Sequence, residues 1–343
     1  MLPNNLIDFR SDTVTEPTPE MRLAMAEAIV GDDVYEEDLT TIRLEKTAAD
    51  MTGKEAGLFV PSGTMGNQLA LFTHAERGEE VILPEACHIV IHEVAAASVI
   101  AGVQLRCLPT RHGEMDYADV VRTVRTELHD IHCPRTALIC YENADSKGQV
   151  RKKEYMLRVK EIADQFGIAG HIDGARIFNA AIANQTNIKE LALYADSISI
   201  CLSKGLCSPI GSVLVGSRNF ITQARKKRKL LGGGMRQSGF LAAPGLISLT
   251  KMSQRLEEDH DNAQYLAHSL SSLPGCEIMY RPEINMVFCK LDTSVSGKEL
   301  SASLRGKDIL INPPSKGTYR FVTHYWIDRH DIDYLVKCLK QYM

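Results

Sequence analysis

A carboxylate and an amine stand at the ends of two apolar runs in the middle of the chain. Asp173 closes the run IAGHID, Lys204 closes the run SISICLSK 31 positions later, and each is followed by a glycine. This separation is about the size of one strand–helix–strand crossover. Two neighbouring parallel strands would then bring both side chains to one edge of a sheet, where open α/β sheets bind their ligands.

Such a pair suits the chemistry of pyridoxal phosphate. A lysine can form a Schiff base with this cofactor, and a carboxylate can keep the pyridine nitrogen protonated so that the ring withdraws electrons. On their own, the two residues are explained at least as well by a buried ion pair or by two unrelated loop positions. The remaining sequence therefore has to distinguish these interpretations.

The composition predicts a globular protein with two unequal lobes. The chain has 343 residues, of which 44% are hydrophobic and 24% are charged. This length exceeds one ordinary core. The formal net charge of -4 gives no electrostatic reason to expect nucleic acid or a membrane surface as a partner. The basic run over 225–229 is compatible with a nucleic-acid patch, but a solvated helix face or an anion site at a subunit contact explains it better.

The cysteines and the first residues bear on the compartment. Nine cysteines are scattered without a C-x-x-C pair, which argues against a disulfide framework and a structural metal site. No apolar stretch is long enough to span a bilayer, and the start of the chain does not have the pattern of a signal peptide. We expect a reducing, cytoplasmic location and no metal.

Alternating strand and helix patterns between residues 57 and 216 predict an α/β fold, in which helices cover both faces of a mainly parallel sheet. The expected strands are Val81–Leu83, Gln104–Leu108, Ala137–Tyr141, Ala169–Asp173, Ser197–Leu202 and Ser212–Val215. Apolar residues at helical spacing predict a helix over Glu154–Phe166.

Beyond residue 250 the pattern changes to that of a smaller α/β lobe. The expected strands there are Glu277–Tyr280, Met286–Leu291, Ile309–Ile311 and Arg320–Thr323, and the expected helices are Lys298–Arg305 and Arg329–Met343. In the opening segment we expect an extended stretch over Asp8–Thr15 and a helix over Pro19–Ile29. The predicted organisation is an N-terminal segment over 1–30, a large domain over 31–250 and a small C-terminal domain over 251–343.

A short glycine loop, Pro61–Thr64, leads from an apolar segment into a helical run. The free N–H groups at a helix N-terminus bind phosphate, and the hydroxyl of Ser62 or Thr64 can add a donor beside Gly63. A plain N-cap explains the same residues without any ligand.

His88 follows an expected strand and could lie flat over a cofactor ring or exchange protons. A lone histidine is more often a surface or core residue. Three arginines could bind anions: Arg236 after a run of three glycines, Arg176 three residues after Asp173, and Arg320 at an expected strand. Each arginine alone could equally form a surface ion pair.

Together, several segments resemble the L-threonine aldolase family of the fold type I, aspartate-aminotransferase-like pyridoxal phosphate enzymes. These segments are DFRSDTVT (8–15), GDDVY (31–35), PSGT (61–64), HIDGARIFNA (171–180), SICLSKGL (199–206), GGGMRQSG (232–239) and RFVTH (320–324). The resemblance implies a fold type I large domain with a mainly parallel seven-stranded sheet, a smaller C-terminal α/β domain, and a homotetramer built from dimers that share their active sites.

The resemblance also implies a role for individual residues. Lys204 is then the Schiff-base lysine, Asp173 the partner of the pyridinium and His88 the residue stacked on the ring. The residues that hold the cofactor's phosphate and its other polar groups are then Ser62, Gly63, Thr64, Ser203, Arg176 and Arg236, the last one from a neighbouring subunit. The residues that bind the substrate are then Ser11, Tyr35, Arg176 and Arg320.

Three positions depart from the family pattern. The family usually reads E-N-T-H-N where this chain reads ENADS over 142–146, so Asp145 replaces the histidine that commonly meets the substrate hydroxyl. Cys207 stands where the family usually has glycine, and Glu16 replaces a common basic residue. The cofactor side is therefore expected to be intact, and the substrate side to be altered.

The expected function is retro-aldol cleavage of a β-hydroxy-α-amino acid, of the L-threonine or L-allo-threonine type, to glycine and an aldehyde. His88 is the first candidate for the base that takes the hydroxyl proton, and Asp145 is the second. An amino-acid racemase or a β-eliminating lyase on the same scaffold is the alternative. A non-catalytic ligand-binding protein is disfavoured because Lys204 and Asp173 are both present, and a plain nucleotide-binding protein because no G-x-G-x-x-G follows the first strand.

Overall fold

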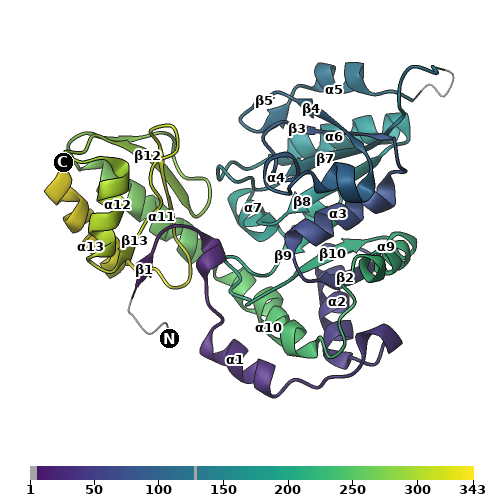
Figure 1. Ribbon diagram of the computed structural model, residues 1–343, viewed down its shortest axis with the longest axis horizontal. Helices are drawn as coiled ribbons and strands as arrows, with labels where there is room; N and C mark the ends of the chain where they lie inside the picture. Colours follow the sequence, from purple (N-terminus) through teal and green to yellow (C-terminus); the bar gives the residue numbers. More distant parts are fainter. Residues whose placement is uncertain (1–5, 127–129) are drawn as a thin grey trace.

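A seven-stranded sheet forms the centre of the larger lobe (Figure 1). The computed structural model describes residues 6–126 and 130–343. The strand order is β2-β10-β9-β8-β7-β3-β4, and only β10 runs antiparallel to its neighbours. The strands are β2 (Ala56–Val60), β3 (Glu80–Pro84), β4 (Gln104–Leu108), β7 (Thr136–Glu142), β8 (Ala169–Gly174), β9 (Ser197–Cys201) and β10 (Ser212–Gly216). The predicted mainly parallel seven-stranded sheet is confirmed.

Helices cover both faces of this sheet because its strands are apolar on both sides. In β7, Ile139 and Tyr141 face one core cluster, and Leu138 and Cys140 face another. The first face is covered by α2 (Leu39–Thr52), α6 (Lys153–Phe166), α7 (Ile177–Ala183), α8 (Ile188–Ala192) and α10 (Gly239–Thr250). The second face is covered by α3 (Gly63–His74), α4 (His88–Ile91) and α9 (Arg218–Leu230).

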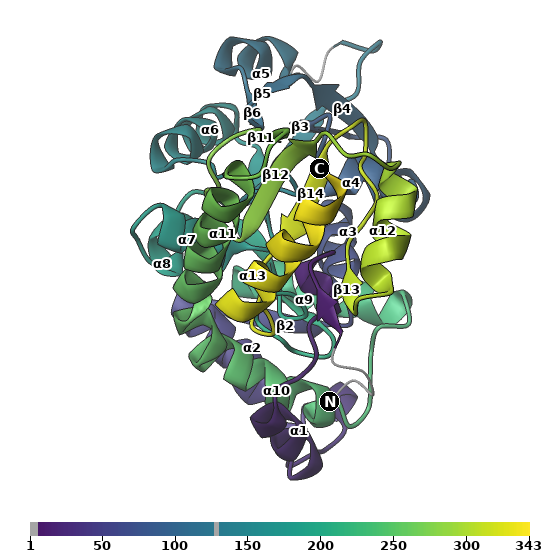
Figure 2. The same cartoon turned by 90° about the vertical axis from the view of Figure 1, so that its left-hand side faces the viewer.

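The smaller lobe has its own apolar core around a three-stranded antiparallel sheet of order β11-β12-β14. Figure 2 shows this lobe facing the viewer, with α13 in front and α11 beside the strands. Its elements are α11 (Leu256–Ser271), β11 (Cys276–Ile278), β12 (Met286–Leu291), α12 (Gly297–Arg305), β13 (Ile309–Leu310), β14 (Tyr319–Val322) and α13 (Arg329–Leu339). A small hairpin of the larger lobe, β5 (Thr110–Arg111) and β6 (Glu114–Met115), precedes α5 (Tyr117–Thr123).

The N-terminal segment contacts both lobes. Its first strand, β1 (Ile7–Asp8), pairs in parallel with β13 of the small lobe, and α1 (Pro19–Ala26) packs against α10. The expectation of an extended stretch over 8–15 is wrong beyond Asp8, because Ser11 caps a 3-10 helix over Asp12–Val14 through the backbone N–H of Thr13. The domain boundaries at residues 30 and 250 stay a prediction.

Candidate active site

A cavity of about 310 Å³ opens at the carboxyl ends of β8 and β9. Asp173 lies in β8 and Lys204 follows β9, so the structure brings together the two residues that the sequence spacing pairs. The lining combines residues from six parts of the chain: Thr13, Thr15, Pro61, Ser62, Gly63, Thr64, Asn67, His88, Glu142, Ala144, Ser146, Asp173, Ala175, Arg176, Cys201, Ser203, Lys204, Ser208 and Pro209.

The Asp173 carboxylate is held at the cavity wall by two donors. The Asn67 side-chain amide donates to one oxygen at 2.7 Å, and the backbone N–H of Ala175 donates to the other at 3.1 Å. Asn67 comes from α3, on the second face of the sheet, and also donates to the buried Glu93 at 2.9 Å. These bonds fix the orientation of a buried carboxylate, which needs partners in a poorly solvated place.

His88 is the first residue of α4 and follows β3, which ends at Pro84, so it lies just past this strand as expected. Its Nδ1 lies 2.8 Å from an oxygen of Glu93, and this hydrogen bond raises the pKa of the imidazole above its usual value. Donor atoms of His88, Glu93 and Asp173 lie within 4.8 Å of one another, close enough to hold a metal ion. The Asn67 amide, however, donates between the two carboxylates, and N–H groups directed there would repel a cation.

The glycine loop forms a cradle beside the cavity. Ser62 caps α3, with its Oγ accepting from the backbone N–H of Met65 at 3.1 Å, and Gly63 is the first helical residue. A Cβ on Gly63 would lie 3.6 Å from the Oγ of Ser212, a buried hydroxyl without a hydrogen-bond partner among the described residues. A phosphate fits these features, because the helix N-terminus offers free N–H groups and a favourable dipole.

Arg176 forms a buried ion pair that the sequence did not reveal. Its Nε and Nη2 donate to the two oxygens of Asp12 at 2.7 and 2.6 Å. Burial alone would raise the pKa of Asp12, but the Arg176 guanidinium outweighs it and holds that pKa well below its usual range. Asp12 follows Ser11 in the 3-10 helix, so the N-terminal segment neutralises a charge at the cavity wall.

Two predicted substrate residues lie near this ion pair but do not line the cavity in the described structure. Arg320 is half-buried and donates to the carbonyl of Arg10 at 3.2 Å. Burial, and then the positive charge of Arg176, lowers its pKa. The Oγ of Ser11 accepts from the backbone N–H of Thr13 at 3.2 Å.

Tyr35 and Arg236 lie elsewhere on the surface. Tyr35 is 72% exposed, and Arg236 pairs with Asp32 at 2.7 Å with 59% of its side chain exposed. Neither residue is among those that line the cavity of the same chain.

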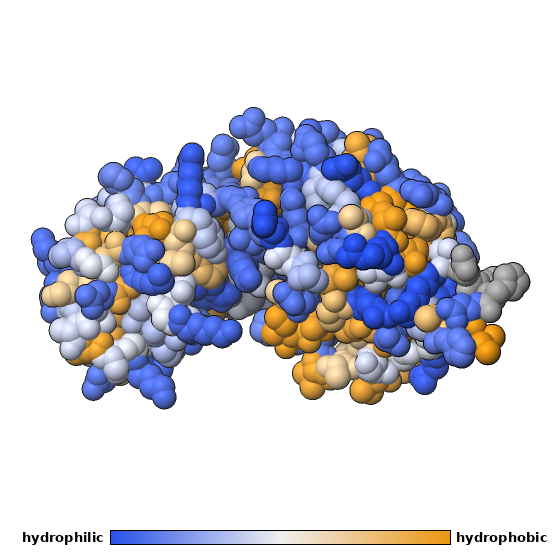
Figure 3. Space-filling model, turned by 90° about the horizontal axis from the view of Figure 1, so that it is seen from above, coloured by the Kyte–Doolittle hydropathy of each residue, from blue (hydrophilic) through white to orange (hydrophobic). Residues whose placement is uncertain are grey.

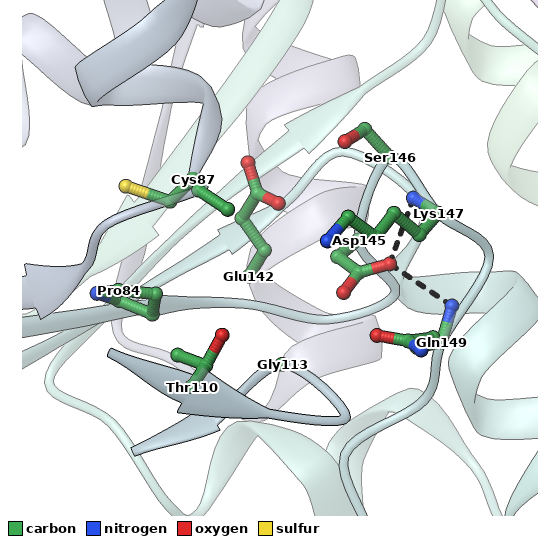
Figure 4. A pocket seen from close by; sticks show the side chains of 10 residues that line it. Pro84, Cys87, Thr110, Gly113, Glu142, Asp145, Ser146, Lys147 and Gln149 are labelled. Carbon is green, nitrogen blue, oxygen red and sulfur yellow. Dashed lines mark hydrogen bonds between the residues drawn. The ribbon is translucent and has the colours of Figure 1, made fainter. Parts of the chain in front are cut away.

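Asp145 lies in a tight turn after β7. One oxygen accepts from the backbone N–H groups of Lys147 and Gln149, both at 2.9 Å, and the other accepts from Arg151 at 2.8 Å. Asp145 lines a second, smaller cavity rather than the one that contains Lys204 (Figure 4). Its carboxylate therefore already has a structural use, since it closes the turn that replaces the usual family sequence.

Three contacts in the site were missed from the sequence. Thr15 donates to the carbonyl of Lys204 at 2.7 Å, Asn67 holds Asp173, and Glu142 stands beside Asp173 in the sheet register. Only Glu142 had a usable signal, because it closes an expected strand next to the one that carries Asp173. The other two contacts join residues more than a hundred positions apart.

The buried side of the site contains a histidine that stays neutral. The Nδ1 of His171 lies 2.8 Å from the Oγ of Ser197, and its Nε2 lies 3.3 Å from the Oδ1 of Asn67. Burial, and then the nearby His74, lowers the pKa of His171 to about 3. In the unfolded chain the same imidazole takes a proton at about pH 6.5.

Acid should therefore destabilise the fold partly through His171. The unfolded state binds one more proton at this residue between about pH 6.5 and pH 3, so the free energy of unfolding falls as the pH falls through this window, by up to ~1.4 kcal/mol per pH unit. We expect His171→Gln to have a shallower decline between pH 6 and pH 4.5. Urea denaturation of protein stripped of small molecules measures this slope.

The matched control for this variant is His268→Gln, at an exposed position on α11. This control should keep the pH slope of the unmodified protein. An unchanged slope in His171→Gln would show that the buried imidazole does not contribute to the acid sensitivity.

Known proteins resemble this chain over most of its length. The family model described as "Beta-eliminating lyase" matches residues 8–294. The low-specificity L-threonine aldolase 1 of Arabidopsis thaliana is 42% identical over 344 residues, covering 98% of this chain and 96% of that protein. The low specificity L-threonine aldolase of Escherichia coli K12 is 42% identical over 332 residues, covering 95% and 96%.

A solved structure has the same fold at much lower identity. The threonine aldolase of Leishmania major superposes with a TM-score of 0.83 at 19% identity, covering 98% of this chain and 99% of that one. Among the described residues, none of the helices has the length and apolarity that a membrane crossing requires. The chain belongs to the beta-eliminating lyase family and, within it, to the L-threonine aldolases, which are fold type I, pyridoxal phosphate-dependent lyases.

Proposed function

We propose that this enzyme cleaves a β-hydroxy-α-amino acid of the L-threonine or L-allo-threonine type to glycine and an aldehyde. The observation that carries this proposal is the common cavity of Lys204 and Asp173, with the Gly63 cradle at its edge. The relatives named low-specificity L-threonine aldolases support the choice of substrate.

Pyridoxal phosphate, when bound, withdraws electrons from the α carbon of an amino acid. Lys204 would attach the cofactor covalently, and Asp173, whose carboxylate Asn67 orients, would keep its ring nitrogen protonated. His88 would pack against the cofactor. Ser62, Gly63, Thr64, Ser203 and Arg176 would hold its other polar groups.

Arg320 is the better candidate for the substrate carboxylate. Arg176 already donates to the two oxygens of Asp12 from its Nε and Nη2, so its charge is neutralised. The guanidinium of Arg320 has only a carbonyl partner in the described structure, so it can offer a bidentate contact to a carboxylate. In this proposal Arg176 stays paired with Asp12, the residue that follows Ser11, and Arg320 is left to bind the substrate.

We infer a homotetramer, built from dimers with shared active sites, to account for Tyr35 and Arg236. Both lie on the surface, away from the cavity of their own chain, and exposed apolar side chains lie close in sequence: Val34, Leu39 and Phe240. Seen from above, the larger lobe carries apolar patches among hydrophilic side chains (Figure 3). In this proposal Arg236 reaches the cofactor and Tyr35 reaches the substrate of the neighbouring subunit.

The nine free thiols support a cytoplasmic location.

Product analysis tests the reaction. The cofactor-loaded enzyme, incubated with L-threonine and with L-allo-threonine, should release glycine and acetaldehyde in equal amounts. Borohydride should fix the cofactor to the peptide that contains Lys204, and Lys204→Ala should lose activity by at least ~10³-fold. The matched control is Lys226→Ala, at an exposed position on α9.

Other products would identify the alternative functions. Ammonium with 2-oxobutanoate would indicate a β-eliminating lyase, and an epimer of the substrate at the α carbon would indicate a racemase. Either result without glycine would overturn the proposed reaction, while the assignment of Lys204 would still stand on the borohydride experiment.

Arg320→Ala should weaken amino-acid binding. Loss of a charge-assisted contact costs about 1.5–3 kcal/mol, so the Kd for glycine, followed by the visible absorption of the bound cofactor, should rise by about 10- to 100-fold. The Kd for the cofactor itself should stay the same. An unchanged Kd for glycine would remove Arg320 from the substrate site, and Arg305→Ala, at an exposed position on α12, serves as the control.

Mixing two variants tests whether the sites are shared. Lys204→Ala and Arg236→Ala are each expected to be impaired. If Arg236 serves the neighbouring subunit, a hybrid dimer with one subunit of each variant has one site that lacks both residues. Its other site retains both residues. Co-refolded mixtures should therefore regain activity, approaching about half of the wild-type value in each hybrid. No recovery in verified hybrids would show that Arg236 serves its own chain or no site.

A further inference from the structure

Glu142 lines the active-site cavity but has no role in the function proposed above. It is the last residue of β7, and its register partner in β8 is Asp173. Its side chain lines the large cavity with Lys204 and also the small cavity of Figure 4, so it forms part of the wall between them.

This carboxyl group is well suited to exchange a proton near neutral pH. Burial, and then the charge of Asp173, raises the pKa of Glu142 to about 7, although the backbone N–H of His88 donates to one oxygen. A base with a pKa near the working pH is the most effective in proton transfer. The titratable and charged groups around it are Cys87, His88, Asp145, Lys147, Asp173, Arg176 and Lys204.

The small cavity offers this carboxyl group a route to solvent. Its volume of about 20 Å³ is enough for one water molecule, and polar side chains line it. Figure 4 shows the Lys147 side chain extending across this cavity toward Glu142. Lys147 is itself exposed, so a water molecule between the two groups could pass a proton from the wall of the large cavity to solvent.

The other candidate bases are less suitable. The Nδ1 of His88 is already engaged in a hydrogen bond with the Glu93 carboxylate, and this bond raises the pKa of the imidazole, so less of it is in the unprotonated form at a given pH. Both oxygens of Asp145 already accept hydrogen bonds within its turn. Glu142 is therefore the carboxylate of the large cavity whose binding partners leave it most able to accept a proton.

We propose that Glu142 is the catalytic residue that accepts the proton of the substrate's β-hydroxyl group, and that it passes this proton to water in the small cavity. The O–H electrons form the carbonyl of the aldehyde, the Cα–Cβ bond breaks, and its electron pair stays on the α carbon. A proton from water then completes glycine, so one proton leaves the hydroxyl and one is returned. This role rests on the proposed aldol cleavage.

A comparison of two reactions of the loaded enzyme tests the role. Glu142→Gln keeps the shape of the side chain and removes its basicity, so kcat for L-allo-threonine cleavage should fall by about 10²-fold or more. Exchange of the glycine α-hydrogen with D2O, followed by NMR, needs no β-hydroxyl base and should stay within about threefold. The exposed Glu85→Gln, three residues before His88, is the matched control and should change neither rate.

The pH dependence of the wild-type enzyme gives a measurement that does not depend on how the variant folds. A base must be ionised, so kcat for cleavage should rise with pH through about 7, whereas glycine exchange should lack this step. In Glu142→Gln the step should disappear from the residual cleavage rate.

Three results would overturn the proposal. Cleavage that survives Glu142→Gln would refute the role of Glu142 alone. Equal loss of both reactions would make Glu142 a support for His88 instead of a proton acceptor. A wild-type enzyme that exchanges the glycine hydrogen but cleaves no β-hydroxy amino acid would refute the proposed aldol function, and this role with it.

Discussion

Two carboxylates lie side by side at the ends of β7 and β8, and the site depends on the hydrogen bonds that allow both of them to be buried there. Glu142 and Asp173 are register partners in a place with little solvent, where two like charges are costly. The structure treats them unequally. Asp173 accepts hydrogen bonds from Asn67 and Ala175, whereas Glu142 accepts one from a backbone N–H. The pKa of Glu142 is raised. Asp173 is thereby fixed in orientation by two donors, whereas Glu142, in the proposed role, is the group that exchanges a proton.

The sequence was sufficient where the relevant pattern is local. The spacing of Asp173 and Lys204 predicted a shared sheet edge because a crossover has a limited range of lengths. The apolar periodicity predicted α6 with an error of one residue, since one face of this helix packs on the sheet. Most strands of both lobes were placed to within one or two residues for the same reason.

The sequence was insufficient where a side chain finds its partner across the fold. Asp12 and Arg176 are 164 positions apart, and nothing near either residue indicates their contact. Asp145 stood out as a departure from the family, but its bonds to Arg151 and to two backbone N–H groups depend on how the turn closes. Cys207 has a φ of 63°, which explains why a glycine is usual there and why the cysteine must be held in place by its buried surroundings.

The N-terminal segment also sets the order in which the enzyme can be completed during synthesis. Its strand β1 pairs with β13, about three hundred residues later, and Thr15 holds the carbonyl of Lys204. Such distant contacts close large loops and form slowly. The large sheet can assemble while the ribosome is still translating the small lobe, but the first residues must wait for nearly the last ones. Until then β1 has no strand to pair with, and the N-terminal segment that carries Asp12 and Thr15 lacks one of its anchors.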